Sequence, residues 1–136
     1  MKPIFLILAV SFLIISCSAN YDGLTETLET LPVSTVDMQT KFAKDSITEI
    51  PVSYVRPTVC HTFYDFYYLR EGTNRTVAII SLKQNGGTSC PASQTTYTVP
   101  LKFKPSSIGT YHFKFWTGTN ASGGDQYTEY DAVVNH

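Results

Sequence analysis

The alternation of apolar and polar residues limits most strongly how this chain can fold. Over the segment 97–104 every second residue is apolar: Tyr97, Val99, Leu101 and Phe103. Lys102 and Lys104 lie between them, so the segment predicts a strand with one face in a core and one face in solvent. Pro100 has no amide proton to donate and therefore favours an edge position in a sheet.

Further segments carry strand signals and are separated by turn residues: 33–42, 47–54, 59–69, 76–82, 111–116 and 126–134. In 59–69, the aromatic run Phe63–Tyr68 occupies both faces, which predicts a central strand covered on both sides. Glu71-Gly72-Thr73-Asn74 predicts a hairpin turn into the next strand. No segment after residue 40 has a helical period, so we expect an all-β chain, a single antiparallel β-sandwich of about seven strands.

Composition agrees with one compact domain. The 136 residues are 43% hydrophobic and 13% aromatic, which excludes disorder caused by low hydrophobicity. The formal net charge is −1. Because nucleic-acid binding needs a basic surface that neutralises phosphates, we expect no nucleic-acid partner.

The N-terminal residues have the order of a secretory signal. Met1-Lys2-Pro3 is basic, 4–15 is apolar apart from Ser11, and the run is shorter than the ~20 residues of a membrane-spanning helix. Ile14-Ile15-Ser16-Cys17 resembles the bacterial lipobox. The resemblance implies cleavage before Cys17 and a diacylglyceryl group on its sulfur, which makes the membrane a partner through this lipid anchor. Ser18 after the lipidated cysteine implies the outer membrane, with the periplasmic or external side left open.

A second processing route also fits the sequence. Cleavage after Ala19 by an ordinary signal peptidase would release a secreted β-sandwich protein without the lipid on Cys17. Asn74-Arg75-Thr76 and Asn120-Ala121-Ser122 are N-glycosylation sequons, which would matter in a eukaryotic secreted protein.

The lipoprotein interpretation divides the chain into three parts: a signal peptide (1–16), a lipidated tether that leads into the first strand (17–40), and the β-sandwich (41–136). Leu24, Leu28 and Leu31 have helical spacing within the tether. A threonine-rich helix of two turns is marginal in isolation, so we expect no more than a transient turn there.

The chain has three cysteines, and assigning Cys17 to lipid leaves Cys60 and Cys90 as a pair. A compartment outside the cytosol permits oxidation, so the sequence favours a Cys60–Cys90 disulfide over two buried free thiols. Such a bridge would fix the loop that contains Cys90 to the expected central strand 59–69, which contains Cys60.

Ser107-Ile108-Gly109-Thr110-Tyr111 resembles the tyrosine corner of immunoglobulin-like domains. The resemblance implies an immunoglobulin-like sandwich in which Gly109 provides backbone freedom and the Tyr111 hydroxyl bonds to nearby backbone. Phe113 stands where antibody domains have their second cysteine, so Cys60–Cys90 is not the usual bridge between the sheets.

Signals for catalysis or metal binding are absent from the sequence. No G-x-S-x-G, H-E-x-x-H, P-loop or C-x-x-C motif occurs, so we expect neither an enzyme nor a cofactor. His61, His112 and His136 are scattered, and hydrogen-bonded or solvated histidines are favoured over metal ligands. The loop 119–125 lacks the dense carboxylates of calcium loops and is interpreted as an ordinary strand connection.

The candidate ligand surface is an outward-facing row. Tyr111, Phe113 and Phe115 occupy alternate positions of the segment 111–116. If they point inward, then His112, Lys114 and Trp116 point outward. A large exposed aromatic with polar neighbours is typical of protein or sugar recognition, whereas a Trp116 covered by the tether or a neighbouring strand would be core. We therefore expect a lipid-anchored envelope protein that serves as a non-enzymatic binding or accessory module. A carbohydrate-binding or hydrolase-accessory module is the alternative. The whole chain resembles small lipoproteins of Bacteroidetes-type bacteria.

Overall fold

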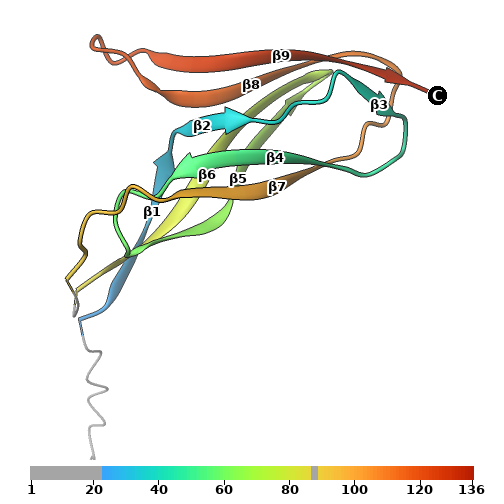
Figure 1. Ribbon diagram of the computed structural model, residues 1–136. Coiled ribbons are helices and arrows are strands. Elements are labelled where there is room, and N and C mark those ends of the chain that lie inside the picture. Colours follow the sequence, from blue (N-terminus) through green and yellow to red (C-terminus); the bar gives the residue numbers. More distant parts are fainter. Residues whose placement is uncertain (1–22, 87–88) are drawn as a thin grey trace, which may run out of the picture.

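The computed structural model describes residues 23–86 and 89–136, which form two packed β-sheets (Figure 1). Cys17, the signal peptide and the start of the expected tether lie outside the described residues. In the described part of the chain, the strands are β1 (Thr25–Leu31), β2 (Val33–Val36), β3 (Lys41–Ala43), β4 (Thr48–Val55), β5 (His61–Glu71), β6 (Asn74–Asn85), β7 (Thr96–Phe103), β8 (Gly109–Thr119) and β9 (Asp125–Asn135). The sandwich-like, all-β prediction is confirmed.

The large sheet has six strands in the described residues, in the order β1-β6-β8-β9-β3, with β5 on the other side of β6. It is mixed, because β6 and β8 run parallel, as do β3 and β9. The expectation of a purely antiparallel sandwich is therefore wrong. The chain leaves the large sheet after β6, adds β7 to the other sheet and returns as β8, and this excursion gives β8 the direction of β6.

The small sheet consists of β2, β4 and β7 in antiparallel order, within the same described ranges. β7 pairs only with β4, so its predicted edge position is confirmed. Pro100 lies opposite Pro51 in the register, at a point where neither residue has an amide proton. Leu101 and Phe103 are buried while Lys102 is exposed, as the alternation predicts.

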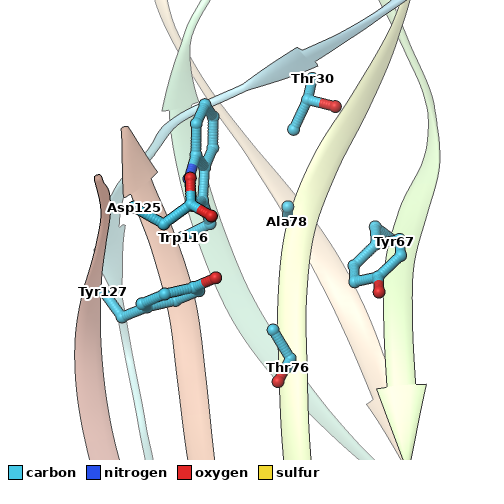
Figure 2. A pocket seen from close by; sticks show the side chains of 7 residues that line it. All are labelled: Thr30, Tyr67, Thr76, Ala78, Trp116, Asp125 and Tyr127. Carbon is cyan, nitrogen blue, oxygen red and sulfur yellow. The ribbon is translucent and has the colours of Figure 1, made fainter. Parts of the chain in front are cut away.

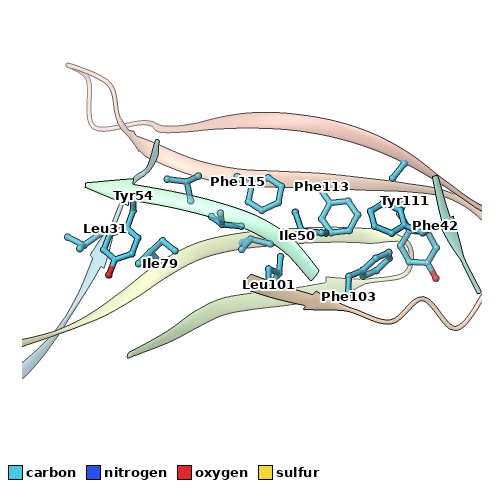
Figure 3. Close-up of a cluster of buried hydrophobic side chains, with 14 of the residues drawn as sticks. Leu31, Phe42, Ile50, Tyr54, Ile79, Leu101, Phe103, Tyr111, Phe113 and Phe115 are labelled. Atoms are coloured by element: carbon cyan, nitrogen blue, oxygen red, sulfur yellow. The ribbon is translucent and has the colours of Figure 1, made fainter. Parts of the chain in front are cut away.

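The core lies between the two sheets and is rich in aromatic rings (Figure 3). The large sheet contributes Tyr111, Phe113 and Phe115 from β8, which are 1%, 0% and 0% exposed. The Phe103 ring from the small sheet makes edge contacts with Tyr111 and Phe113 at centroid distances of 5.3 and 5.0 Å. The inward direction predicted for alternate β8 residues is confirmed.

The segment from Thr25 to Leu31 is a strand, where a tether with a transient turn was expected. β1 pairs with β6 in continuous antiparallel register, from Thr25 opposite Asn85 to Leu31 opposite Ile79. Leu31 is buried, whereas Leu28 points away from the core. The threonines that weaken a helix favour a strand once a partner is present, because β-branched side chains suit a pleated surface.

β5 is an edge strand and not the predicted central one, because it pairs only with β6. Its aromatic residues divide between the faces: Phe63 and Phe66 pack against the core, while Tyr64 and Tyr67 are exposed. A register shift between Phe63 and Asp65 adds a residue to β5. The outer aromatics are thus not covered by a further layer of this chain in the described residues.

Two local predictions are confirmed. β5 and β6 form a hairpin across Gly72 and Thr73, and Gly72 has a φ of 59°, the left-handed conformation that glycine adopts without strain. Cys60 and Cys90 form a disulfide with a Cα–Cα distance of 5.4 Å. The bridge connects the loop before β7 to the start of β5. No helix in the described residues is long and apolar enough to cross a lipid bilayer.

Candidate functional site

Trp116 lies on the outer face of the large sheet, next to an irregularity in β8. Trp116 pairs with Tyr127 of β9, and the register shifts before Gly118 pairs with Gln126. Gly118 has a φ of 121°, which only glycine adopts readily. Bulges of this kind redirect side chains at the end of a strand pair. Here Trp116, Tyr127 and Asp125 come together on one face.

The indole of Trp116 is held in place by a carboxylate. Its Nε1 donates a hydrogen bond of 2.9 Å to Oδ1 of Asp125. Asp125 starts β9 directly after a turn in which Oδ1 of Asn120 accepts bonds from the amides of Ser122 and Gly124 at 3.0 and 2.8 Å. The turn and the carboxylate together restrain the orientation of the ring.

A hollow of about 330 Å³ opens beside Trp116, and we call it the aromatic hollow (Figure 2). Its lining comes from five strands of the large sheet: Thr30 (β1), Tyr67 (β5), Thr76 and Ala78 (β6), Trp116 (β8), Asp125 and Tyr127 (β9). Figure 2 shows Trp116 and Tyr127 on one side and Tyr67 on the other, with Ala78 between them. The small side chain of Ala78 leaves the space between the rings open.

Several polar groups around the aromatic hollow have no protein partner. No described residue forms a hydrogen bond with the side-chain hydroxyls of Thr30, Tyr67, Thr76 or Tyr127. Oδ2 of Asp125 likewise has no bond within the described residues. The hollow therefore combines flat aromatic surfaces with donors and acceptors that are available to a ligand.

A second hollow of about 370 Å³ adjoins the first, and we call it the adjoining hollow. Thr30 and Tyr67 line both hollows. Leu28, Tyr64 and Ile80 add apolar surface to the adjoining hollow, and its charged residues are Glu29 and Asp65. The two hollows therefore adjoin each other over β1, β5 and β6 and share a wall.

Of the predicted outward row, Trp116 alone lines the aromatic hollow. His112 and Lys114 are exposed on the same face but are paired with carboxylates of β9. Nδ1 of His112 is hydrogen-bonded to Asp131, and Nζ of Lys114 lies 3.7 Å from Oε1 of Glu129. Trp116 itself is partly buried, between the exposed and covered alternatives that the sequence left open.

The residues of the predicted tyrosine corner lie in contact with one another. The Tyr111 hydroxyl is 2.9 Å from Oγ of Ser107 and accepts a bond from its amide at 3.4 Å. Gly109 has a φ of 127°, so a side chain at this position would strain the backbone. These contacts fix the start of β8 and play no part in the hollow.

Another polar cluster connects β5, β1 and β6 of the large sheet. His61 is 2% exposed, its Nε2 donates to Oε2 of Glu29 at 2.9 Å, and its Nδ1 bonds to the Thr58 hydroxyl at 2.8 Å. Nζ of Lys83 lies 3.1 Å from the other oxygen of Glu29. The hydrogen bonds from His61 and Lys83 lower the pKa of the Glu29 carboxyl below its usual value. Glu29 also contributes to the lining of the adjoining hollow, and the cluster cross-links β1, β5 and β6.

In the described residues, no group of three His, Cys, Asp or Glu side chains is placed so that it could hold a metal ion. The aromatic hollow is thus the candidate site. Sequence reasoning identified Trp116 and missed Tyr67 and Tyr127, because their approach depends on strand register. No protein-family model matches this chain, and no curated protein or solved structure is significantly similar to it.

Proposed function

We propose that this protein is a non-enzymatic binding module of the bacterial cell envelope and that the aromatic hollow is its ligand-binding surface. The observation that carries the proposal is the convergence of Trp116, Tyr127 and Tyr67 from three strands around one open space. Aromatic rings at such sites provide large contact area at low entropic cost. The restraint of Trp116 by Asp125 means that little ordering is needed when a ligand binds.

A binding role suits the chemistry of the hollow better than catalysis does. Asp125 is its one charged lining residue, and one of the two carboxylate oxygens is engaged by the indole. No histidine, lysine, cysteine or second carboxylate lines this hollow to act with Asp125 in general acid–base chemistry, and its other titratable groups are the phenols of Tyr67 and Tyr127. The absence of catalytic motifs from the sequence supports the same conclusion.

The envelope location follows from the lipobox-like Ile14-Ile15-Ser16-Cys17. Cys17 carries the lipid, and Ser18 directs the protein to the outer membrane. Two or more acyl chains hold a protein stably, because each buried methylene contributes about 0.8 kcal/mol. The intact mass of the mature protein tests this assignment. A lipid-modified Cys17 start is expected, and a free Asn20 start would replace the anchor with ordinary secretion after Ala19.

We further propose that the fold is distantly related to immunoglobulin-like sandwiches. The bonds between Tyr111 and Ser107 support it, because they reproduce the contact that defines a tyrosine corner. The parallel pair β6–β8 departs from the antiparallel arrangement of those domains. The resemblance to Bacteroidetes-type lipoproteins agrees with the lipobox and the length of the chain.

Trp116 fluorescence tests the binding role directly, because Trp116 is the single tryptophan of the chain. Envelope extract from the source organism is separated into protein, polysaccharide and lipid fractions, and each is titrated into the mature protein. We expect a saturable change with one fraction, lost in Tyr127→Ala and retained in His112→Ala. If no fraction changes the emission, the hollow is not a ligand site and the proposal fails.

A further inference from the structure

We infer that the ligand of the aromatic hollow is a neutral oligosaccharide that extends into the adjoining hollow. The inference rests on the proposed function and specifies the class of ligand. Three features of the described residues carry it: the ring surfaces, the unpaired hydroxyls and the sign of the charges.

The ring surfaces suit a molecule that is flat and apolar on its faces. A pyranose ring presents C–H groups on its faces, and these pack against the π surface of an aromatic side chain. Trp116 and Tyr127 lie on one side of the hollow and Tyr67 on the other, across Ala78 (Figure 2). Tyr67 is 48% and Tyr127 38% exposed, so both rings have surface left to bury.

The unpaired polar groups suit a molecule that carries hydroxyls around its edge. The side-chain hydroxyls of Thr30, Tyr67, Thr76 and Tyr127 can each donate and accept, and Oδ2 of Asp125 can accept. A purely apolar ligand would cover these groups without satisfying them, and a buried polar group without a hydrogen-bond partner weakens binding. A polyhydroxylated ligand avoids that loss.

The charges disfavour an acidic ligand. The charged residues that line the two hollows are Asp125, Glu29 and Asp65, and neither lining contains a lysine, arginine or histidine. Two cations outside the linings are already engaged by carboxylates: Lys83 lies 3.1 Å from Glu29, and Lys114 lies 3.7 Å from Glu129. Glu29 is already paired with His61 and Lys83, so an anionic polymer would meet the carboxylates of Asp125 and Asp65 and no cation among the lining residues.

The shared wall of the two hollows indicates a ligand of several units. Thr30 and Tyr67 line both spaces, so a chain seated against Tyr67 in the aromatic hollow continues towards Tyr64 and Leu28. Contacts in both hollows add to the affinity of a chain, while a monosaccharide uses the aromatic hollow alone. Tyr64 should therefore matter for long ligands and not for short ones.

Calorimetry with oligosaccharides of matched backbone and different charge tests the inference. The probes are cellohexaose, a chitosan hexamer and a hexamer of β-1,4-linked glucuronic acid, with mannohexaose and xylohexaose as further neutral chains. We expect at least one neutral hexamer to bind and to change Trp116 emission, and the glucuronic acid hexamer not to bind. Tighter binding of the cationic chitosan hexamer, lost at high salt, would overturn the inference in favour of an amine site.

Variants locate the binding on the face. Tyr127→Ala should weaken the neutral hexamer at least about tenfold, whereas His112→Ala, outside the hollow, should not. Tyr64→Ala should weaken the hexamer and leave the monosaccharide unchanged. Tyr127→Phe keeps the ring and should retain most of the affinity. It is the control that separates loss of the ring from loss of the fold at this position.

The outcomes separate this inference from the proposed function. If no oligosaccharide binds but a protein or lipid fraction still changes Trp116 emission in a Tyr127-dependent way, the ligand is not an oligosaccharide. The aromatic hollow then remains supported as a binding site. If neither oligosaccharides nor envelope fractions change the emission, both fail.

Discussion

Nε2 of His61 lies 2.9 Å from Oε2 of Glu29, and this contact connects β5 to β1 across β6. His61 is almost fully buried, whereas the Glu29 side chain is 39% exposed. Lys83 of the intervening β6 reaches the same carboxylate at 3.1 Å. Three neighbouring strands, β1, β6 and β5, are thus held by one acidic group.

Glu29→Gln should destabilise the protein at neutral pH and not in acid. The pKa of Glu29 lies below its ordinary value of 4.5, because its charged form accepts bonds from His61 and Lys83. A lowered folded-state pKa means that the stabilisation is present above the unfolded-state pKa and is lost as the pH falls through the folded-state pKa. Because the group is more than a third exposed, the difference at pH 7 should not exceed about 1 kcal/mol.

Urea unfolding of both proteins at pH 7, 5, 4 and 3 measures this difference. Glu26→Gln on the same strand is the matched control, since Glu26 forms no ion pair or hydrogen bond in the described residues. A gap between wild type and Glu29→Gln that stays constant over this pH range would contradict the assignment.

Removing the disulfide should cost far more than removing the ion pair. The Cys60–Cys90 bridge closes a loop with a sequence separation of 30. Constraining such a loop in the unfolded chain stabilises the folded state by about 3.5 kcal/mol. The double variant Cys60→Ser/Cys90→Ser should therefore unfold at a clearly lower urea concentration, and wild type treated with reductant should match it. Unfolding of the double variant at the wild-type midpoint would show that the bridge does not stabilise the fold.

Tyr111→Phe separates the hydroxyl bonds of β8 from the packing of its ring. The ring is 1% exposed and stays in the core, while the bonds to Ser107 are lost. A loss of about 1 kcal/mol in the free energy of unfolding is expected. Tyr127→Phe removes a hydroxyl without a protein partner in the described residues and should change stability by less than about 0.5 kcal/mol. Equal losses in the two variants would rule out a special role for the Tyr111–Ser107 contact.

Phe103→Ala should be the most damaging of these substitutions. The ring lies 5.1 Å from Phe42, 5.3 Å from Tyr111 and 5.0 Å from Phe113, measured between centroids, so it joins the small sheet to the large one. Truncation leaves a cavity among these rings and should cost about 3–5 kcal/mol. Lys102→Ala, on the outer face of the same strand, should have little effect. Thermal unfolding of both variants tests the assignment, and a small loss for Phe103→Ala would place the ring outside the core.

The parts of the fold that could be predicted are those encoded within one strand or one turn. The alternation around Leu101 and Phe113 defined which side chains point inward, and Gly72 marked the hairpin. β1 could not be predicted in this way, because a segment of threonines, glutamates and two leucines becomes a strand here only through pairing with β6. Its stability comes from a partner some fifty residues away in the sequence, as the register of Thr30 with Ile80 shows.

The candidate site also has a part that the sequence predicts and a part that depends on the pairing of strands. Alternation placed Trp116 on the outer face without reference to any other strand. Tyr67 and Tyr127 reach the hollow only through the register of β5 with β6 and of β8 with β9. Several registers are consistent with one sequence, so the grouping of these rings is a property of the assembled sheet.

The position of β1 also determines how the protein would carry mechanical load. The strand begins at Thr25, on the side of the proposed anchor at Cys17, and reaches the aromatic hollow at Thr30. Tension between an anchored N-terminus and a held ligand would run along β1. The backbone bonds between β1 and β6 lie across that direction, so they would resist the tension together, in shear, and not one after another. β1, which lies within the segment expected as a tether, would then transmit force between the membrane and the ligand.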